Sequence, residues 1–239
     1  MKTIGVLGGM SSFATAEYYR LLNAGVRERL GGHSAADVVI YSVDFAVMEQ
    51  FIRDQAWEAA ARHLVDRALK VQAAGAEFLV LATNTFHRVA DRIEMSLSIP
   101  FVHIVDVTAD AALADGVSTV GLLGTSPVME ASFYRDRFAR SGVDVLVPAP
   151  SDRALVHRVI FEELTHGAID PDSRREYLRI MQDLGARGAQ GIVLGCTEIS
   201  LLVGPGDTPG IRLYDTTALH VQRAVSLALS QPSAASHPS

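Results

Sequence analysis

The chain has 239 residues, of which 49% are hydrophobic and one is a cysteine, and its formal net charge is −6. This length is enough for one large core or for two cores of about 100 residues each. One cysteine excludes an internal disulfide, and an acidic chain without a run of Lys or Arg argues against a nucleic-acid surface. No apolar stretch approaches the roughly 20 residues that span a bilayer. We therefore expect a cytoplasmic protein that acts on small molecules and binds neither nucleic acid nor membrane.

The first predicted element is a strand at Thr3–Gly8, followed by the turn GGMSS and a helix to about Leu30. The turn lacks the G-x-G-x-x-G spacing of a dinucleotide site. Its backbone N–H groups and the helix N-terminus could bind a carboxylate. A plain turn in which Ser11 or Ser12 caps the helix explains these residues equally well.

A second strand is predicted at Asp37–Phe45, and the polar segment after it contains Arg53. An arginine beside a cleft can bind a carboxylate through two hydrogen bonds. From the residues alone, an exposed i, i+4 pair between Glu49 and Arg53 is the better interpretation.

A third strand at Phe78–Ala82 leads into Thr83, Asn84, Thr85 and His87. Threonine and asparagine commonly begin helices, so this exit could be no more than a helix cap. A lone histidine one turn further on is more often packed or hydrogen-bonded than catalytic. A fourth strand is predicted at Pro100–Asp106.

The second half of the chain repeats the first. Gly75–Thr85 (GAEFLVLATNT) matches Gly188–Glu198 (GAQGIVLGCTE), so that Thr83 corresponds to Cys196. Three further pairs of segments match in the same order: Ile4–Gly8 with Val120–Gly124, Asp37-Val38 with Asp144-Val145, and Pro100–Ala109 with Pro209–Ala218. The second copy carries an insertion at about 152–171, in which Leu155–Leu164 is predicted to be helical and Thr165-His166-Gly167 ends the helix.

Buried strands with polar exits, separated by helices, predict an α/β fold of two similar Rossmann-like domains with parallel sheets. The duplication predicts that a pseudo-two-fold axis relates the domains and that the active site lies in the cleft between them. The expected domains are 1–105 plus 209–230 and 106–208. Residues 231–239, rich in Ser, Ala and Pro, are expected to be a flexible tail.

Cys196 is the candidate for chemistry. A buried free cysteine is usually an inert apolar residue. This one follows a strand and precedes Thr197 at an expected helix start, where N–H dipoles would lower its pKa and favour the thiolate. A thiolate at that place could act as a base or a nucleophile.

Four motifs together resemble the aspartate/glutamate racemase family, whose members need no pyridoxal phosphate: GxLGGMS at the N-terminus, ATNTxH around Thr83, LLGT at Thr125 and GCTE at Cys196. The resemblance covers about residues 3 to 229. It implies two α/β domains, a homodimer, and two cysteines that flank the substrate α-carbon. One cysteine removes the α-proton as a thiolate, and the other donates a proton from the opposite face.

Carried onto this chain, the two cysteine positions are Cys196 and Thr83. The resemblance also implies substrate contacts from Met10, Ser11, Asn84, Thr85, Thr125 and Thr197, and it makes Arg53 a side-chain anchor. Where the family often has a lysine, this chain has Thr165-His166, and His166 could stand in for it.

Threonine does not ionise at neutral pH, so Cys196 is expected to be the base and Thr83 a proton relay or donor. In the family the second-half cysteine takes the proton of the L isomer, so L-aspartate or L-glutamate is the expected substrate. No cofactor is expected, because nothing marks a Schiff-base lysine. The eight histidines and Cys196 show no metal-ligand spacing.

Two alternatives remain open at this point. Related single-cysteine enzymes decarboxylate substituted malonates, and an apolar pocket for the leaving carboxylate would favour that reaction. The other alternative is an amino-acid-binding protein that has lost activity together with its first cysteine.

Overall fold

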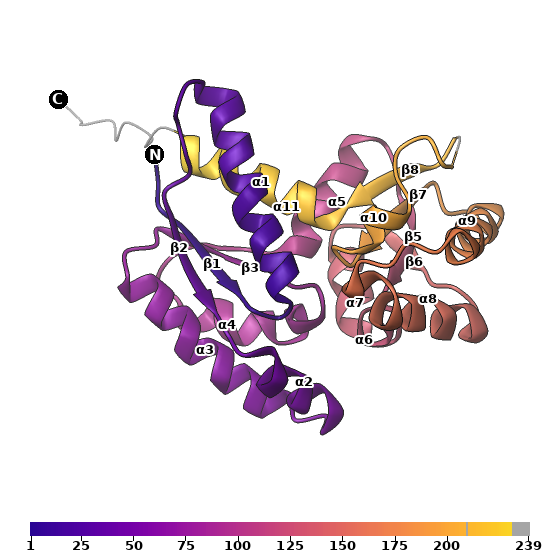
Figure 1. Cartoon of the computed structure of the whole chain (residues 1–239), viewed down its shortest axis with the longest axis horizontal. Helices are drawn as coiled ribbons and strands as arrows, with labels where there is room; N and C mark the ends of the chain where they lie inside the picture. The colour runs from indigo at the N-terminus through magenta and orange to yellow at the C-terminus, as the bar shows by residue number, and fades with distance from the viewer. Residues whose placement is uncertain (209, 231–239) are drawn as a thin grey trace.

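The computed structural model describes residues 1–208 and 210–230; Pro209 and the expected tail at 231–239 lie outside the described residues. Two lobes lie side by side, each built on one sheet (Figure 1). The first half of the chain forms β1 (Ile4–Gly8), α1 (Ser12–Leu30), β2 (Val38–Ser42), α2 (Phe45–Arg53), α3 (Trp57–Ala73), β3 (Phe78–Leu81), the 3-10 helix η1 (Thr85–Val89), α4 (Ala90–Ser96), β4 (Phe101–Val102) and α5 (Ile104–Ala114).

The second half repeats this order with an additional helix. It forms β5 (Thr119–Gly124), α6 (Ser126–Glu130), α7 (Ser132–Arg140), β6 (Asp144–Leu146), α8 (Pro150–Glu162), η2 (Leu164–His166), α9 (Pro171–Ala186), β7 (Gly191–Gly195), α10 (Ile199–Leu202), β8 (Arg212–Asp215) and α11 (Thr216–Leu229). Within residues 1–208 and 210–230, no helix is long and apolar enough to cross a bilayer.

The two sheets have the same topology. Their strand orders are β2-β1-β3-β4 and β6-β5-β7-β8, and every pairing is parallel. Matching strands of the two halves therefore hold matching places, as the repeat predicted. The predicted fold class, two Rossmann-like α/β domains with parallel sheets, is confirmed.

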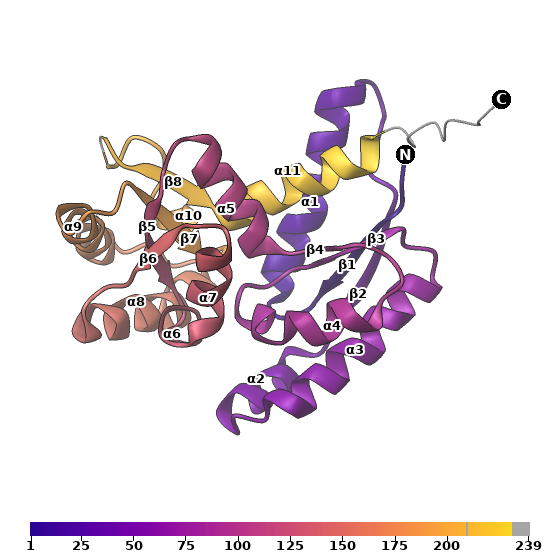
Figure 2. The same cartoon turned by 180° about the vertical axis from the view of Figure 1, so that it is seen from behind.

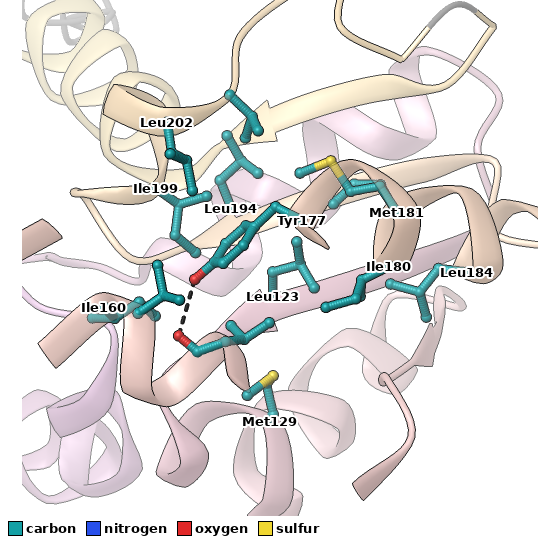
Figure 3. Packing of buried hydrophobic residues seen from close by; sticks show 14 of the residues in the cluster. Leu123, Met129, Ile160, Tyr177, Ile180, Met181, Leu184, Leu194, Ile199 and Leu202 are labelled. Carbon is teal, nitrogen blue, oxygen red and sulfur yellow. Dashed lines mark hydrogen bonds between the residues drawn. The ribbon is translucent and has the colours of Figure 1, made fainter. Parts of the chain in front are cut away.

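Each sheet lies between two layers of helices, because its strands are apolar on both faces. In β5 and β7, Leu123 and Leu194 face the helices α8 and α9, whereas Leu122 and Val193 face α5 and α7. Figure 3 shows the first of these cores, where the buried Tyr177 of α9 donates a hydrogen bond to the Val156 carbonyl oxygen at 2.9 Å. Each fully buried leucine, isoleucine or methionine side chain of this core contributes about 1.5–3 kcal/mol of hydrophobic stabilisation.

The last helix of each half packs on the other lobe. Ile104, Val105 and Ala109 of α5 lie in a core of the second lobe, although α5 follows a strand of the first sheet. Reciprocally, Val221 and Val225 of α11 lie in a core of the first lobe, and both Figure 1 and Figure 2 show α11 beside α1. This exchange ties the lobes together and holds the strand ends on either side of the cleft.

The structure corrects two sequence predictions. The last strand was expected to join the first domain with residues 209–230, but β8 pairs with β7 in the second sheet, and only α11 returns to the first lobe. The strand predicted at Pro100–Asp106 is only Phe101–Val102, because His103 caps α5 by accepting a hydrogen bond from the Val105 N–H at 3.2 Å. We therefore propose that the lobe boundary lies between β4 and α5 and again between β8 and α11.

Candidate active site

The carboxyl ends of β1, β3, β5 and β7 meet at a cavity of about 590 Å³ between the lobes. This is the edge at which parallel α/β sheets bind their ligands. Nine of the ten predicted site residues line it: Met10, Ser11, Thr83, Asn84, Thr85, Thr125, His166, Cys196 and Thr197. Thr83 follows β3 of one lobe and Cys196 follows β7 of the other, so the two repeat-equivalent residues share one cavity.

Arg53 is the predicted site residue that the structure does not bring to the cavity. Its Nη1 lies 3.5 Å from Oε1 of Glu49, and its Nη2 donates to Oε1 of Gln50 at 2.8 Å. The Arg53 side chain is 59% exposed. It therefore forms the surface i, i+4 pair that the sequence alone favoured, whereas its partner Glu49 lines the cavity.

The turn after β1 brings the first lobe to the cavity. Gly9 has φ of 92°, and a Cβ there would collide with the backbone of Val43, so this position requires glycine. Ser11 caps α1 by accepting from the Ala14 N–H at 3.2 Å, and its hydroxyl also lies 3.4 Å from Oε1 of Glu198 in the other lobe. The expected cap and a contact across the cleft are therefore both present.

Glu198 is a site residue that was not predicted from the sequence. Its side chain is buried, and its Oε2 accepts a hydrogen bond from Sγ of Cys196 at 3.0 Å. The signal for it was present in the repeat, because Glu198 is the counterpart of Thr85, a residue assigned to the site. A carboxylate at this distance can take the thiol proton.

The prediction that the pKa of Cys196 is lowered is wrong for the free protein. Burial and the negative charge of Glu198, together with the hydrogen bond that the thiol donates to that carboxylate, raise the pKa of Cys196 well above its ordinary value. The backbone N–H groups of Thr197 and Glu198 act in the predicted direction but are outweighed. Cys196 is thus a protonated thiol at rest, with an acceptor for its proton in contact.

The equivalent contact in the other half of the cleft is uncharged. Thr85 is the repeat counterpart of Glu198, and its Oγ1 lies 3.2 Å from Oγ1 of Thr125. The exit of β7 therefore holds a thiol beside a carboxylate, whereas the exit of β3 holds hydroxyls at the corresponding places. The two faces of a bound molecule would meet different chemistry.

Asn84 is buried and bridges the two halves of the chain. Its Oδ1 accepts from the Tyr134 hydroxyl at 2.7 Å, and its Nδ2 donates to Oγ1 of Thr216 at 3.1 Å. The Thr216 hydroxyl in turn donates to the Leu194 carbonyl oxygen, next to the Cys196 strand end. The amide predicted to hold substrate is therefore engaged in keeping the two strand ends in place.

His87 holds the backbone of Thr83. Its Nε2 accepts from the Ile104 N–H at 3.2 Å, so Nδ1 carries the proton that it donates to the Thr83 carbonyl oxygen at 2.6 Å. Burial, together with the neighbouring His103 and His220, holds the pKa of His87 well below its ordinary value. His87 is thus a neutral, packed side chain, as its sequence position suggested.

A family model described as Asp/Glu/Hydantoin racemase matches residues 7–224. The chain belongs to this family. The crystal structure of a Yersinia pestis protein whose Asp/Glu racemase name is itself provisional shares 44% sequence identity, covers 96% of this chain and 100% of that chain, and superposes with a TM-score of 0.91. PH1733 of Pyrococcus horikoshii OT3, an aspartate racemase homologue, shares 31% identity with coverage of 96% and 100% and a TM-score of 0.86.

Among characterised relatives, the broad specificity amino-acid racemase RacX of Bacillus subtilis is 26% identical over 148 residues. That match covers 60% of this chain and 63% of RacX, less than two thirds of the length of RacX. The expected racemase family is therefore confirmed for this chain.

Apolar side chains make up much of the remaining cavity wall in this racemase-family protein: Phe13, Phe45, Ile52, Phe86, Ile160 and Phe161. The sequence analysis assigned none of these residues to the site. Phe45 and Ile52 lie on α2, and Ile160 and Phe161 lie on α8, so two helices from different lobes contribute to the wall. His166 follows α8 at the same wall and is exposed.

Proposed function

We propose that this protein racemises an amino acid without pyridoxal phosphate, with Cys196 as the base and Thr83 as the proton relay on the opposite face. One observation carries the proposal. The repeat-equivalent exits of β3 and β7 place Thr83 and Cys196 on one cavity, and of the two only Cys196 has an acceptor for its proton, Glu198. Among the described residues that line the cavity none is a lysine, so no side chain there offers a Schiff base.

The reaction begins with the thiol proton. Glu198 takes it, and the α-ammonium group of a bound amino acid favours the resulting thiolate. Sγ of Cys196 then removes the α-proton, and the electron pair of the C–H bond stays on the α-carbon, delocalised into the carboxylate. The Thr83 hydroxyl passes a proton to the other face and is reprotonated from solvent, while Glu198 releases its proton to solvent, which restores the resting state. The turn at Met10-Ser11 and the hydroxyls of Thr125 and Thr197 would hold the carboxylate and ammonium groups.

The two walls predict unequal rates of α-proton exchange for the two enantiomers. Removal of a proton needs a base, and the Thr83 hydroxyl, which does not ionise at neutral pH, is a poor one. The family resemblance assigns the second-half cysteine to the L isomer. We therefore infer that L-amino acids exchange their α-proton fast and D-amino acids slowly, whereas kcat/KM for net racemisation is equal in the two directions because enantiomers have equal free energy.

Replacing Thr83 with cysteine should raise kcat/KM for racemisation by about tenfold or more, equally in both directions, since a positioned base contributes about 10²–10⁴. Adding Thr85→Glu should raise it further, because that change reproduces the contact between Glu198 and Cys196. Chiral chromatography of the product from each pure enantiomer measures the effect. Thr83→Ser, which keeps a hydroxyl, is the matched control and should leave both rates unchanged. No gain in Thr83→Cys would show that the two strand ends do not face one α-carbon.

The mixed polar and apolar wall argues against the malonate-type decarboxylase. A leaving carboxylate needs an apolar pocket, but hydroxyls of Ser11, Thr85 and Thr125 share the cavity with its apolar side chains. A binding protein without activity would not need Glu198 in contact with the thiol. A homodimer follows from the family resemblance, and a cytoplasmic location follows from the composition; both stay predictions.

A further inference from the structure

The charged side chains that line the cavity are acidic. Asp44, Glu49 and Glu198 contribute carboxylates, and no Lys or Arg occurs among the lining residues within the described part of the chain. Glu198 contacts Cys196 and Ser11, so it belongs to the proton chemistry. Asp44 and Glu49 have no part in that proton chemistry, and their charges would interact with the side chain of a bound substrate.

Neither the Asp44 nor the Glu49 carboxylate forms a strong ion pair with another residue of the described chain. Asp44 caps α2 through Oδ1, which accepts from the Ala46 N–H at 2.9 Å, and it forms no ion pair within residues 1–208 and 210–230. Glu49 is paired with Arg53 at 3.5 Å, in an exposed i, i+4 arrangement. Such exposed pairs contribute little to stability, so a cation that enters the cavity can replace Arg53 at little cost.

The face of α2 that lines the cavity alternates apolar and acidic groups. Phe45, Glu49 and Ile52 lie one turn apart along the helix, at i, i+4 and i+7, and all three line the cavity. Across the cleft, Ile160 and Phe161 of α8 add apolar surface. An alkyl chain fits between these walls, and a positive group at its end would meet Glu49 and the ring of Phe45.

The same cavity would bind an acidic side chain unfavourably. Its carboxylate would enter a partly closed cavity beside two carboxylates, with no guanidinium or ammonium group on the described lining to receive it. A desolvated charge without a partner is unfavourable, and like charges make it more so. The anchor expected for aspartate or glutamate, Arg53, is held at the exposed end of α2.

We propose that this cavity takes amino acids with a cationic alkyl side chain, of the lysine and ornithine kind, in preference to aspartate and glutamate. The proposal rests on the racemase function proposed above. The site is the cavity that holds Cys196; Glu49 and Asp44 are its specificity-determining residues. The cavity volume of about 590 Å³ leaves room for a side chain longer than that of aspartate.

The test compares α-proton exchange of L-lysine, L-norleucine and L-glutamate with the wild-type protein in D₂O, followed by proton NMR. Norleucine has the same carbon chain as lysine but lacks the side-chain ammonium group. The comparison therefore separates the effect of the charge from that of apolar packing. We expect kcat/KM for lysine to exceed that for norleucine several-fold and that for glutamate at least about tenfold. The variant Glu49→Gln should lower the lysine value about tenfold and leave the norleucine value unchanged.

Glu58→Gln is the matched control. Glu58 also pairs with an arginine, Arg92 at 3.4 Å, but it is 70% exposed and does not line the cavity, so its replacement should change none of the three rates. Faster exchange of glutamate than of lysine would overturn the specificity proposal and leave the racemase function standing. Equal rates for lysine and norleucine would also overturn it. Absence of exchange in all three would overturn the racemase function, and the specificity proposal with it.

Discussion

Replacing Cys196 with alanine should abolish α-proton exchange, leaving no more than about 1% of the wild-type rate. The reason is that Cys196 is the one ionisable group at either repeat-equivalent strand end, and loss of a positioned base costs about 10²–10⁴ in rate. Glu198 would remain, but its carboxylate is set to receive the thiol proton. Exchange is measured by proton NMR in D₂O at saturating substrate.

The same substitution should leave the fold almost unchanged. Cys196 lies at the edge of a second-lobe core and is only partly buried, so losing its sulfur should lower the free energy of unfolding by about 1 kcal/mol. Thermal unfolding of the purified variant checks this. Cys196→Ser is a second variant, which keeps the side-chain shape and should be equally inactive. Residual exchange of more than a few per cent in both would mean that another base removes the proton.

Replacing Glu198 with glutamine should move the acidity of Cys196 and the turnover in opposite directions. The carboxylate opposes the thiolate by its charge and accepts the thiol hydrogen bond, so its removal should lower the pKa of Cys196. Alkylation by iodoacetamide should then begin at a lower pH than in the wild type. Turnover should nevertheless fall by about tenfold to a hundredfold, because the acceptor of the thiol proton is gone.

Two measurements separate this role from a structural one. A pH series of alkylation rates gives the position of the thiol titration, and kcat measured over the same range gives the turnover. Ser11→Ala is the control for the thiol titration, since it removes the other contact of Glu198 and keeps the carboxylate beside the thiol, so Cys196 should be alkylated over the same pH range as in the wild type. If turnover of Glu198→Gln rises together with the thiolate, Glu198 does not receive the proton, and the mechanism must use another acceptor.

The fold and the two central residues of the site followed from the repeat. Matching two buried strands identified Thr83 and Cys196 as equivalent, and parallel topology then required both to lie at the same edge of their sheets. The family resemblance supplied the eight other assignments. Seven of these residues line the cavity, next to the ends of β1, β3, β5 and β7 or after α8, and Arg53 does not.

The errors concern features that depend on contacts distant in sequence. The strand β8 was assigned to the wrong lobe, although the repeat matches it with β4, which pairs with β3, and so indicated pairing with β7. The pKa of Cys196 depends on the direction in which the Glu198 side chain points, and a helix start alone predicted the opposite shift. Glu49 and Arg53 share a face of α2, so helix periodicity alone cannot show that Glu49 lines the cavity whereas Arg53, the last residue of the helix, does not.

The measurement that tests the central claim most directly is α-proton exchange by the wild-type protein in D₂O with no added cofactor, for the L and D isomers of one amino acid. Proton NMR follows the loss of the α-proton, and chiral chromatography identifies the product. We predict rapid α-proton exchange of the L isomer with formation of the D isomer, and at least about tenfold slower α-proton exchange of the D isomer. Equal exchange rates for the two enantiomers, or no exchange with any L-amino acid, would contradict a cavity in which Cys196 and Glu198 form the single base.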